Sequence, residues 1–465
     1  SGFAGVSFSR NENDYGVPGE HAADETIIKM ESDRFEFRSE IEIAGSDWLN
    51  GVELNFGYGD YKHTESDVSG IHATYLREGY EGRIGFDHEI GDLRGTFGVH
   101  GLFDEFKIDG HHSILSGLRQ KWSDDPPLST SVSSADLDSN PDIEGEDSSR
   151  IALFLVEEYD LDSETILNFG VRGEQIDRDY QGTSDRDDST ISASGGISRD
   201  INELWNISGN LSYSERLPDT AELFADGPHH ATEAYEIGNP NLETETARGV
   251  EIIVRKTAGK VTGQFSAFHT RFNNYVFLEE ADPAQERDDE GRLKNDAKYP
   301  SSDGFPAGEE GLPVHEYQSI KAEYQGIEVE IDWLAMENPG WDLLLSAYGD
   351  LLRGKNKTEG GNLSRIPATR LGLGFEVQQE KLDFGANLVR SFKQDKLGHH
   401  EETTPAHSLL SAYASYDFSA GDAAGHVFLR GYNLTDELAY NHSSLLKQFA
   451  PLPGRSVEIG LKFDF

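Results

Sequence analysis

The last eleven residues of the chain, RSVEIGLKFDF (455–465), alternate between polar and apolar side chains. Successive side chains of a β-strand point to opposite faces, so a period of two predicts a strand with one apolar face. The apolar face carries Val457, Ile459, Leu461, Phe463 and Phe465. The other face carries Ser456, Glu458, Gly460, Lys462 and Asp464.

The same alternation recurs along the chain, for example over residues 52–59, 371–377 and 382–388. The polar face of these segments is rich in Glu, Arg and Gly, which is unusual for a packed core. Such a face suits a wide lumen that holds water or another domain. The apolar face then points outward.

The connections between the expected strands alternate in length. We expect about eighteen strands, from 1–10 to 455–465, and few helices. Short connections include AGSD (45–48), LDSE (161–164), INEL (201–204), AGK (258–260) and QQEK (378–381). Long connections include 11–33, 108–149, 215–246, 273–317 and 433–454. This sorting by length predicts an all-β, transmembrane antiparallel β-barrel with periplasmic turns and long extracellular loops, whereas a sandwich or propeller gives no reason for it.

Composition excludes several classes of function. The formal net charge of -45 would repel nucleic acid. No cysteine is present, so the chain has no disulfide framework and no thiolate metal site. No apolar run reaches the length of a membrane-spanning helix. No G-x-S-x-G elbow or other triad spacing occurs, and Glu157 and Glu158 should point to opposite faces of a strand, so we do not expect an enzyme.

Two stretches resemble a known family. SERLPDTAELFADGPHHATEAYEIGNPNLETETARGVEI (214–252), with Asn239, Pro240, Asn241 and Leu242, resembles the mid-barrel signature of TonB-dependent receptors. GYNLTDELAYNHSSLLKQFAPLPGRSVEIGLKFDF (431–465), with Pro453, Gly454, Arg455 and Phe465, resembles their C-terminal signature. Together these stretches cover roughly 75 residues, and the rest of the chain agrees in its strand pattern.

The resemblance implies a Gram-negative outer-membrane barrel of 22 strands around a plug, which imports a scarce ligand with energy passed through TonB. Residues 1–465 would be the barrel domain of such a receptor, with the plug, the segment that contacts TonB and about four strands expected before Ser1. It also implies contact with outer-membrane lipid, recognition of Phe465 by the barrel-assembly machinery, and a monomer. A complete passive porin of 18 strands is the alternative of another class.

Zinc-uptake receptors show the greatest similarity within the family. The similar segments are GFAGVSFSR…YGVPGEH (2–21), GPHHAT (227–232) and HSSLLKQFAPLPGR (442–455). The external loop after YGVPG is often rich in histidine in these receptors, whereas here it retains only His21, followed by Asp24 and Glu25. The three similar segments imply zinc as the transported ligand, and the external loop is where this chain departs from those receptors.

Histidines and carboxylates of the outer loops are the candidate ligand residues. Imidazole and carboxylate bind zinc, and three or four such groups must converge. The candidates are His229, His230, Glu233, Glu236, His442, His399 and His400, with His407 nearby. Adjacent His229 and His230 should point to opposite sides of an extended backbone, so one of them serves a given site.

Other ligands remain open. Haem receptors also carry Asn-Pro-Asn-Leu after a histidine, but their Phe-Arg-Ala-Pro element is Glu-Arg-Leu-Pro at 215–218 here. A ferric-siderophore receptor would use aromatic residues such as Tyr275, Phe277 and Tyr317. The acidic run DLDSNPDIEGED (136–147) has Pro141 where a calcium loop of the EF-hand type needs Gly, so only weak calcium binding by a solvated loop is expected there.

Overall fold

A computed structural model gives the fold of the chain. It describes residues 2–17, 26–68, 70–109, 145–180, 185–229, 232, 234–281, 311–420 and 423–464. Its helix and strands are β1 (Gly2–Val17), β2 (Thr26–Glu42), β3 (Leu49–Ser66), β4 (Ile71–Ile90), β5 (Leu93–Asp109), β6 (Glu146–Asp162), β7 (Thr165–Tyr180), β8 (Arg186–Asn202), β9 (Trp205–Arg216), α3 (Thr220–Phe224), β10 (Asp226–His229), β11 (Ala234–Ile237), β12 (Glu245–Lys256), β13 (Val261–Glu280), β14 (Val314–Asn338), β15 (Trp341–Asn356), β16 (Arg370–Gln379), β17 (Leu382–Ser391), β18 (His407–Ala420), β19 (Ala423–Tyr432) and β20 (Ser456–Asp464).

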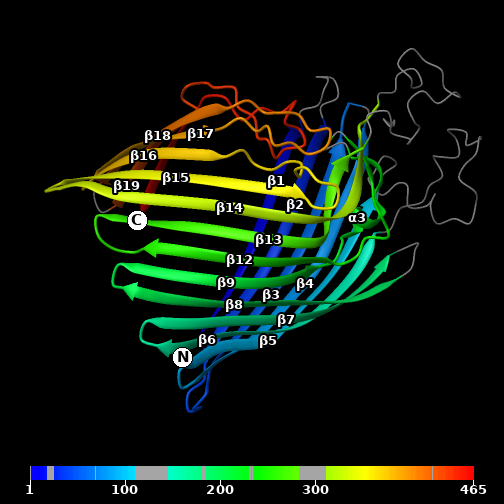
Figure 1. Cartoon of the computed structure of the whole chain (residues 1–465), viewed down its shortest axis with the longest axis horizontal. Coiled ribbons are helices and arrows are strands. Elements are labelled where there is room, and N and C mark those ends of the chain that lie inside the picture. Colours follow the sequence, from blue (N-terminus) through cyan, green and yellow to red (C-terminus); the bar gives the residue numbers. More distant parts are fainter. Residues whose placement is uncertain are drawn as a thin grey trace, which may run out of the picture.

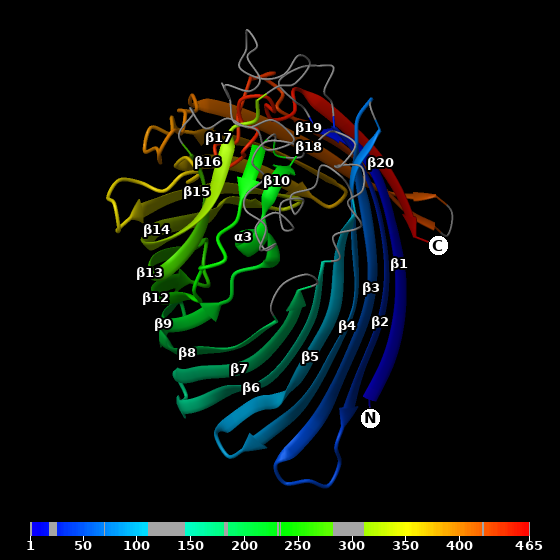
Figure 2. The same ribbon diagram turned by 90° about the vertical axis from the view of Figure 1, so that its right-hand side faces the viewer.

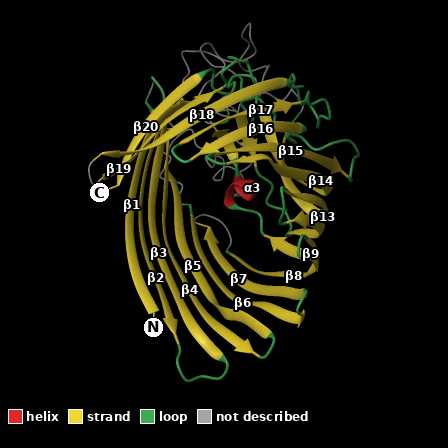
Figure 3. Cartoon of the chain, turned by 90° about the vertical axis from the view of Figure 1, so that its left-hand side faces the viewer, coloured by secondary structure: helices red, strands yellow, loops and turns green. Residues whose placement is uncertain are grey.

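The long strands pair antiparallel with their neighbours in the chain and curve into a barrel (Figure 1). Among the described residues, only β10 and β11 lie outside this succession, because β9 pairs directly with β12. Eighteen long strands therefore form the wall, as the alternation predicted. β1 and β20 lie next to each other at the ends of the ring (Figures 2 and 3), although no β1–β20 pairing occurs between the described residues.

The apolar face predicted for each strand points outward. Val457, Ile459 and Leu461 of β20 are well exposed, and so are Leu371 and Leu373 of β16. Exposed aliphatic side chains on the outer wall of a barrel are those that contact lipid. In the part of the chain that the structure describes, no helix is long and apolar enough to span a membrane.

Exposed tryptophans mark one end of the barrel. The four that lie in the described ranges, Trp48, Trp205, Trp333 and Trp341, are at the end where the short turns lie. Tryptophan prefers the boundary between the hydrocarbon and the headgroups. This end therefore marks one membrane interface, and the long connections lie beyond the other.

Two predictions about elements need correction. The connection expected over 11–33 is shorter, because β1 continues to Val17 and β2 begins at Thr26, with paired backbone along their whole length. The mouth also contains a short helix, α3, that the strand periodicity does not reveal. Asp219 accepts a hydrogen bond from the Glu222 backbone N–H, and the Glu222 side chain accepts one from the Asp219 N–H. This capping box is the local signal that begins the helix.

Candidate functional site

The described residues of the segment 217–244 cross the mouth of the barrel. Figure 2 shows α3 and β10 inside the ring, between β3–β5 on one side and β12–β14 on the other. On the first side, Ala225 packs with Ala73, Tyr75 and Ile108 of β4 and β5. Since the segment also packs against β7 and β13, it connects opposite walls.

Leu223 and Leu242 make the second contact, with Tyr180 of β7 and Val276 of β13. Leu242 is the last residue of the Asn239–Leu242 signature and is 3% exposed. Within that turn the Asn239 side chain accepts a hydrogen bond from the Asn241 N–H at 3.0 Å, and the Asn239 N–H donates to the Glu222 carbonyl at 2.8 Å. Pro240 occupies the position between these two asparagines. The signature thus fastens the segment to α3 and the wall rather than presenting ligand atoms.

β10 and β11 form a short hairpin that carries two of the predicted ligand residues. His229 ends β10, and its Nδ1 lies 2.8 Å from Glu236 Oε1 on β11. Glu236 also accepts hydrogen bonds from the hydroxyls of Tyr317 at 3.0 Å and Thr232 at 3.1 Å. The predicted candidates His230 and Glu233 lie outside the described residues.

The other ring nitrogen of His229 faces the opposite wall. His229 Nε2 lies 3.9 Å from Glu65 Oε1, and His63 Nε2 lies 3.9 Å from the same oxygen. His63 and Glu65 project from β3 into the lumen, and the His63 ring stacks on Tyr75 with centroids 4.3 Å apart. Glu65 and Glu236 are each 2% exposed. Sequence reasoning missed His63 and Glu65 because a strand residue shows its partners only through the sheet register.

The protonation of His229 and Glu236 is set by each other. Burial by itself lowers the pKa of His229, but the hydrogen bond to Glu236 and the charges of Glu236 and Glu65 outweigh it, so the pKa is raised. Burial by itself raises the pKa of Glu236, yet the hydrogen bonds from His229, Tyr317 and Thr232 lower it. An imidazolium is therefore favoured between two carboxylates. In the described part of the chain, no three His, Asp or Glu side chains are close enough together to form a ready-made metal site.

A second network holds His442, another predicted candidate. His442 Nε2 lies 3.1 Å from Glu401 Oε1, and Thr404 Oγ1 lies 3.0 Å from His442 Nδ1. Glu401 also accepts hydrogen bonds from Lys447 Nζ at 2.8 Å and from the Arg365 and Gly398 backbone N–H groups. Burial opposes its charge, but these donors lower the pKa of Glu401 to about 2. The His442 ring thus joins loop 433–455 to loop 392–406, and Glu401 extends the network to Arg365 in a third outer loop.

The remaining predicted candidates, His399 and His400, are exposed beside that network. They line a cavity of about 250 Å³ with Glu280 and His315. Thr232 also lines it, so the cavity adjoins the hairpin of His229. The candidate histidines that the structure describes thus lie in two groups at the mouth, one around His229 and one around His442.

The C-terminal signature braces the last loop. Pro453 accepts a hydrogen bond from the Asn433 side chain at 3.1 Å, and the Arg455 N–H donates to Asp436 Oδ1 at 3.0 Å. Gly454 lies between them, close to Asp436. Phe465 lies outside the described residues.

The residues considered for siderophore or haem binding make contacts with other residues of the protein. The Tyr275 hydroxyl bonds that of Tyr324 at 2.7 Å, and Phe277 is buried beside Ile320. Tyr317 bonds Glu236. In the 215–218 element, Arg216 pairs with Glu222 at 2.8 Å.

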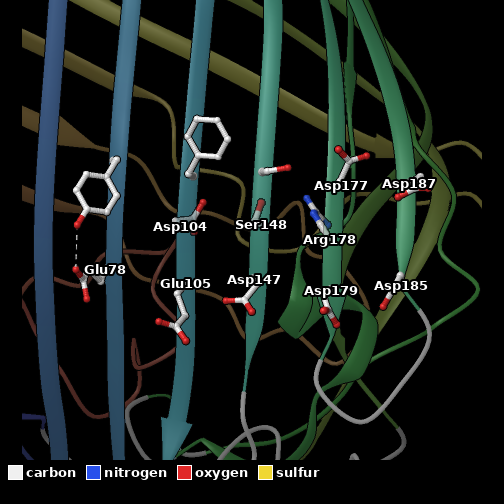
Figure 4. Close-up of a pocket in the computed structure, with 13 residues that line it drawn as sticks. Glu78, Asp104, Glu105, Asp147, Ser148, Asp177, Arg178, Asp179, Asp185 and Asp187 are labelled. Atoms are coloured by element: carbon white, nitrogen blue, oxygen red, sulfur yellow. Dashed lines mark hydrogen bonds between the residues drawn. The ribbon is translucent and has the colours of Figure 1, made fainter.

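Acidic side chains gather on the outer wall, around a pocket of about 550 Å³ (Figure 4). One row of directly paired residues carries a carboxylate on each of four adjacent strands: Glu78, Glu105, Asp147 and Asp179. Asp177, Asp185 and Asp187 lie beside it. Of the acidic run 136–147 considered for calcium, residues 136–144 lie outside the described ranges.

Comparisons with known proteins agree with the barrel. A family model described as TonB dependent receptor-like, beta-barrel, matches residues 2–434. The copper transporter OprC is 14% identical with a TM-score of 0.75, covering 100% of this chain and 69% of that one. The siderophore receptor PirA from Acinetobacter baumannii is 16% identical with a TM-score of 0.66, covering 100% and 68%. The hemophore receptor HasR of Serratia marcescens, solved as a double mutant with hemophore HasA and heme, is 14% identical with a TM-score of 0.64, covering 99% and 68%.

Proposed function

Because the chain belongs to the TonB-dependent receptor β-barrel family, we propose that it serves in a Gram-negative outer membrane as an uptake receptor for a metal ion or metal complex, with zinc as the metal. The similar structures include proteins named for copper, a siderophore and heme, so the ligand must be argued from the mouth of this barrel. The half-buried His229 between Glu65 and Glu236 carries the proposal.

The spacing of the donors suits a small cation. Zinc binds imidazole and carboxylate at about 2.0–2.2 Å in a tetrahedral arrangement, which places neighbouring donor atoms roughly 3.4 Å apart. His63 Nε2 and His229 Nε2 each lie 3.9 Å from Glu65 Oε1. We therefore propose that these three groups move closer together to hold one ion, which replaces the proton on His229.

Glu236 fits the role of an orienting group. Ligating histidines usually donate their second ring N–H to a carboxylate, which fixes the tautomer and the ring position. His229 Nδ1 and Glu236 have that relation at 2.8 Å. The Tyr317 hydroxyl in turn holds Glu236.

Transport requires partners that the family implies. We propose that energy reaches the receptor through TonB and that the outer wall contacts lipid. Recognition of Phe465 by the barrel-assembly machinery and a monomeric state belong to the same proposal.

Calorimetry of the purified receptor in detergent tests the ligand. We expect zinc to bind with at least micromolar affinity, and His229→Ala, alone or with His230→Ala, to weaken binding severely. Glu236→Gln should weaken it by about 10- to 100-fold, as expected for a group that orients a ligand. His426→Ala, which removes a histidine paired with Asp417 near the short-turn end, is the matched control and should change nothing.

Haem as the transported ligand predicts a different result in this experiment. If zinc produces no binding heat while added haem shifts its Soret band, the receptor takes haem. A haem shift that disappears in His229→Ala would assign the same histidine to haem iron.

A further inference from the structure

The outer wall of β12–β15 changes from apolar to positively charged between successive rows of paired residues. Two rows are apolar: Val254, Phe265, Val329 and Gly349, followed by Ile252, Ala267, Ile327 and Leu351. Ile252, Phe265 and Ile327 are exposed, so these rows belong to the band that contacts lipid.

The next rows, toward the long loops, carry cations: one in the first row and three in the second. Val250, His269, Gln325 and Arg353 pair in the first of them, and Arg248, Arg271, Glu323 and Lys355 pair in the second. Directly paired residues share a face of the sheet, so these side chains point outward like the apolar rows below them. Lys321 and Lys357 lie one step further out. We call Arg248, Arg271, Lys321, Arg353, Lys355 and Lys357 the basic rim.

The basic rim contrasts with the rest of the protein. The chain carries 85 acidic and 40 basic residues, yet the two basic rows contain a single carboxylate, Glu323. That carboxylate contacts several cations loosely, with Arg271 Nε and Lys357 Nζ each 3.6 Å away. The Arg271 side chain remains 73% exposed and that of Lys357 48% exposed. Cations therefore exceed the local negative charge.

We propose that the basic rim is a docking surface for the phosphate groups of glycolipids in the outer leaflet. The rim lies directly above the lipid-facing band, at the level of lipid headgroups, and it faces outward rather than into the lumen. Arginine binds phosphate in bidentate geometry and lysine binds it as a point charge. A phosphorylated lipid can place its acyl chains against Ile252 and Ile327 while its phosphates contact Arg271 and Lys355.

Native mass spectrometry of the receptor in detergent, with bisphosphorylated lipid A as the probe, tests this surface. The wild-type protein should retain this lipid in preference to the same lipid with its phosphates removed. A cation near an anionic lipid surface contributes about fivefold, so Arg271→Gln with Lys355→Gln should weaken retention roughly 25-fold.

A pair of lumen-facing arginines supplies the matched control. Arg34 and Arg38 of β2 pair with Glu36 and Glu40 and lie on the face opposite the exposed Phe35. Arg34→Gln with Arg38→Gln removes the same charge and should leave retention within about twofold of wild type. The charge-preserving Arg271→Lys with Lys355→Arg should retain most binding.

Equal retention of the two lipids, or equal loss in both pairs of charge-removing variants, would overturn the proposal. The heat-dependent shift in electrophoretic mobility of a folded barrel shows that each variant has folded. If the double variant does not fold, Lys355→Gln alone should still lower retention about fivefold. Since no zinc is added, the result is independent of the ligand proposed above.

Discussion

Glu401 shows how one side chain can organise the mouth. It accepts hydrogen bonds from Lys447 Nζ and from the Arg365 and Gly398 backbone N–H groups, and His442 Nε2 lies 3.1 Å away. These partners belong to three different outer loops, 357–369, 392–406 and 433–455. A buried carboxylate is stable as an ion when several donors surround it. No local sequence motif indicates this role, because the donors are far apart in the sequence.

We predict that Glu401→Gln loosens these loops at neutral pH. The change removes charge-assisted hydrogen bonds, at a cost on the order of 2–3 kcal/mol in the local opening free energy. Hydrogen exchange of the amides in 392–406 and 433–455 measures it. Glu402→Gln, which changes the exposed neighbour, should leave the exchange unaltered.

The same network fixes a pH dependence. The pKa of Glu401 is about 2 in the folded protein, below its value of about 4.3 in an unfolded chain. Its stabilisation is therefore complete above that unfolded value and is lost as pH falls through about 2. Exchange protection in these loops should decline between about pH 4 and pH 2 in wild type and stay flat in Glu401→Gln.

At the scale of elements, the strands could be predicted from the sequence, whereas the arrangement of the segments at the mouth of the barrel could not. The alternation in 371–377 is decided by the lipid contacts of the strand itself, so a single sequence reveals it. His63 and Glu65 look like ordinary strand residues, and only the fold of the chain places Glu65 3.9 Å from His229. The Asp219-x-x-Glu222 capping box was a readable signal for α3 that the dominant strand pattern obscured.

The acidic row on β4–β7 provides a test at this scale. Like charges directly opposite each other on adjacent strands destabilise a sheet. Asp147→Asn, which removes the charge between Glu105 and Asp179, should therefore raise the apparent melting temperature by about 1–3 °C at low salt. In 1 M salt, where the screening length is about 3 Å, the gain should largely disappear.

Asp160→Asn gives the opposite sign in the same strand. Asp160 accepts a hydrogen bond from Arg94 Nη1 at 2.5 Å, so its neutralisation should lower the melting temperature. A loss of stability in both variants would show that the acidic row is not a source of repulsion.

At the scale of the whole molecule, the residue types on the outer wall follow the layers of the membrane that they contact. The tryptophans at the short-turn end and the basic rim toward the long loops bracket the apolar band of the outer wall. The number of long strands and the sorting of loops by length follow from periodicity alone. The crossing of the mouth by residues 217–244 does not, because it depends on contacts with β4, β7 and β13 that no local pattern encodes.

Insertion of a charge into the apolar band tests the membrane assignment. Ile252 of β12 is 51% exposed on the outer wall, in one of the apolar rows described above, and pairs with Gly209. An arginine on the lipid-facing side costs about 2–4 kcal/mol near the middle of the bilayer, so Ile252→Arg should reduce folding into lipid vesicles, measured by the electrophoretic shift. Asn210→Arg, on the lumen face of the neighbouring strand β9, should fold normally.

The segment that crosses the mouth has a mechanical consequence. The described residues of the segment 217–244 pack on β4 and β5 at one side and on β7 and β13 at the other. They therefore hold these strands at a fixed separation at the outer end of the barrel. Flattening the rim would pull Leu223 and Ala225 out of their packed positions. The opposite end has only short turns between neighbouring strands and no comparable brace among the described residues, so changes of cross-section should concentrate there.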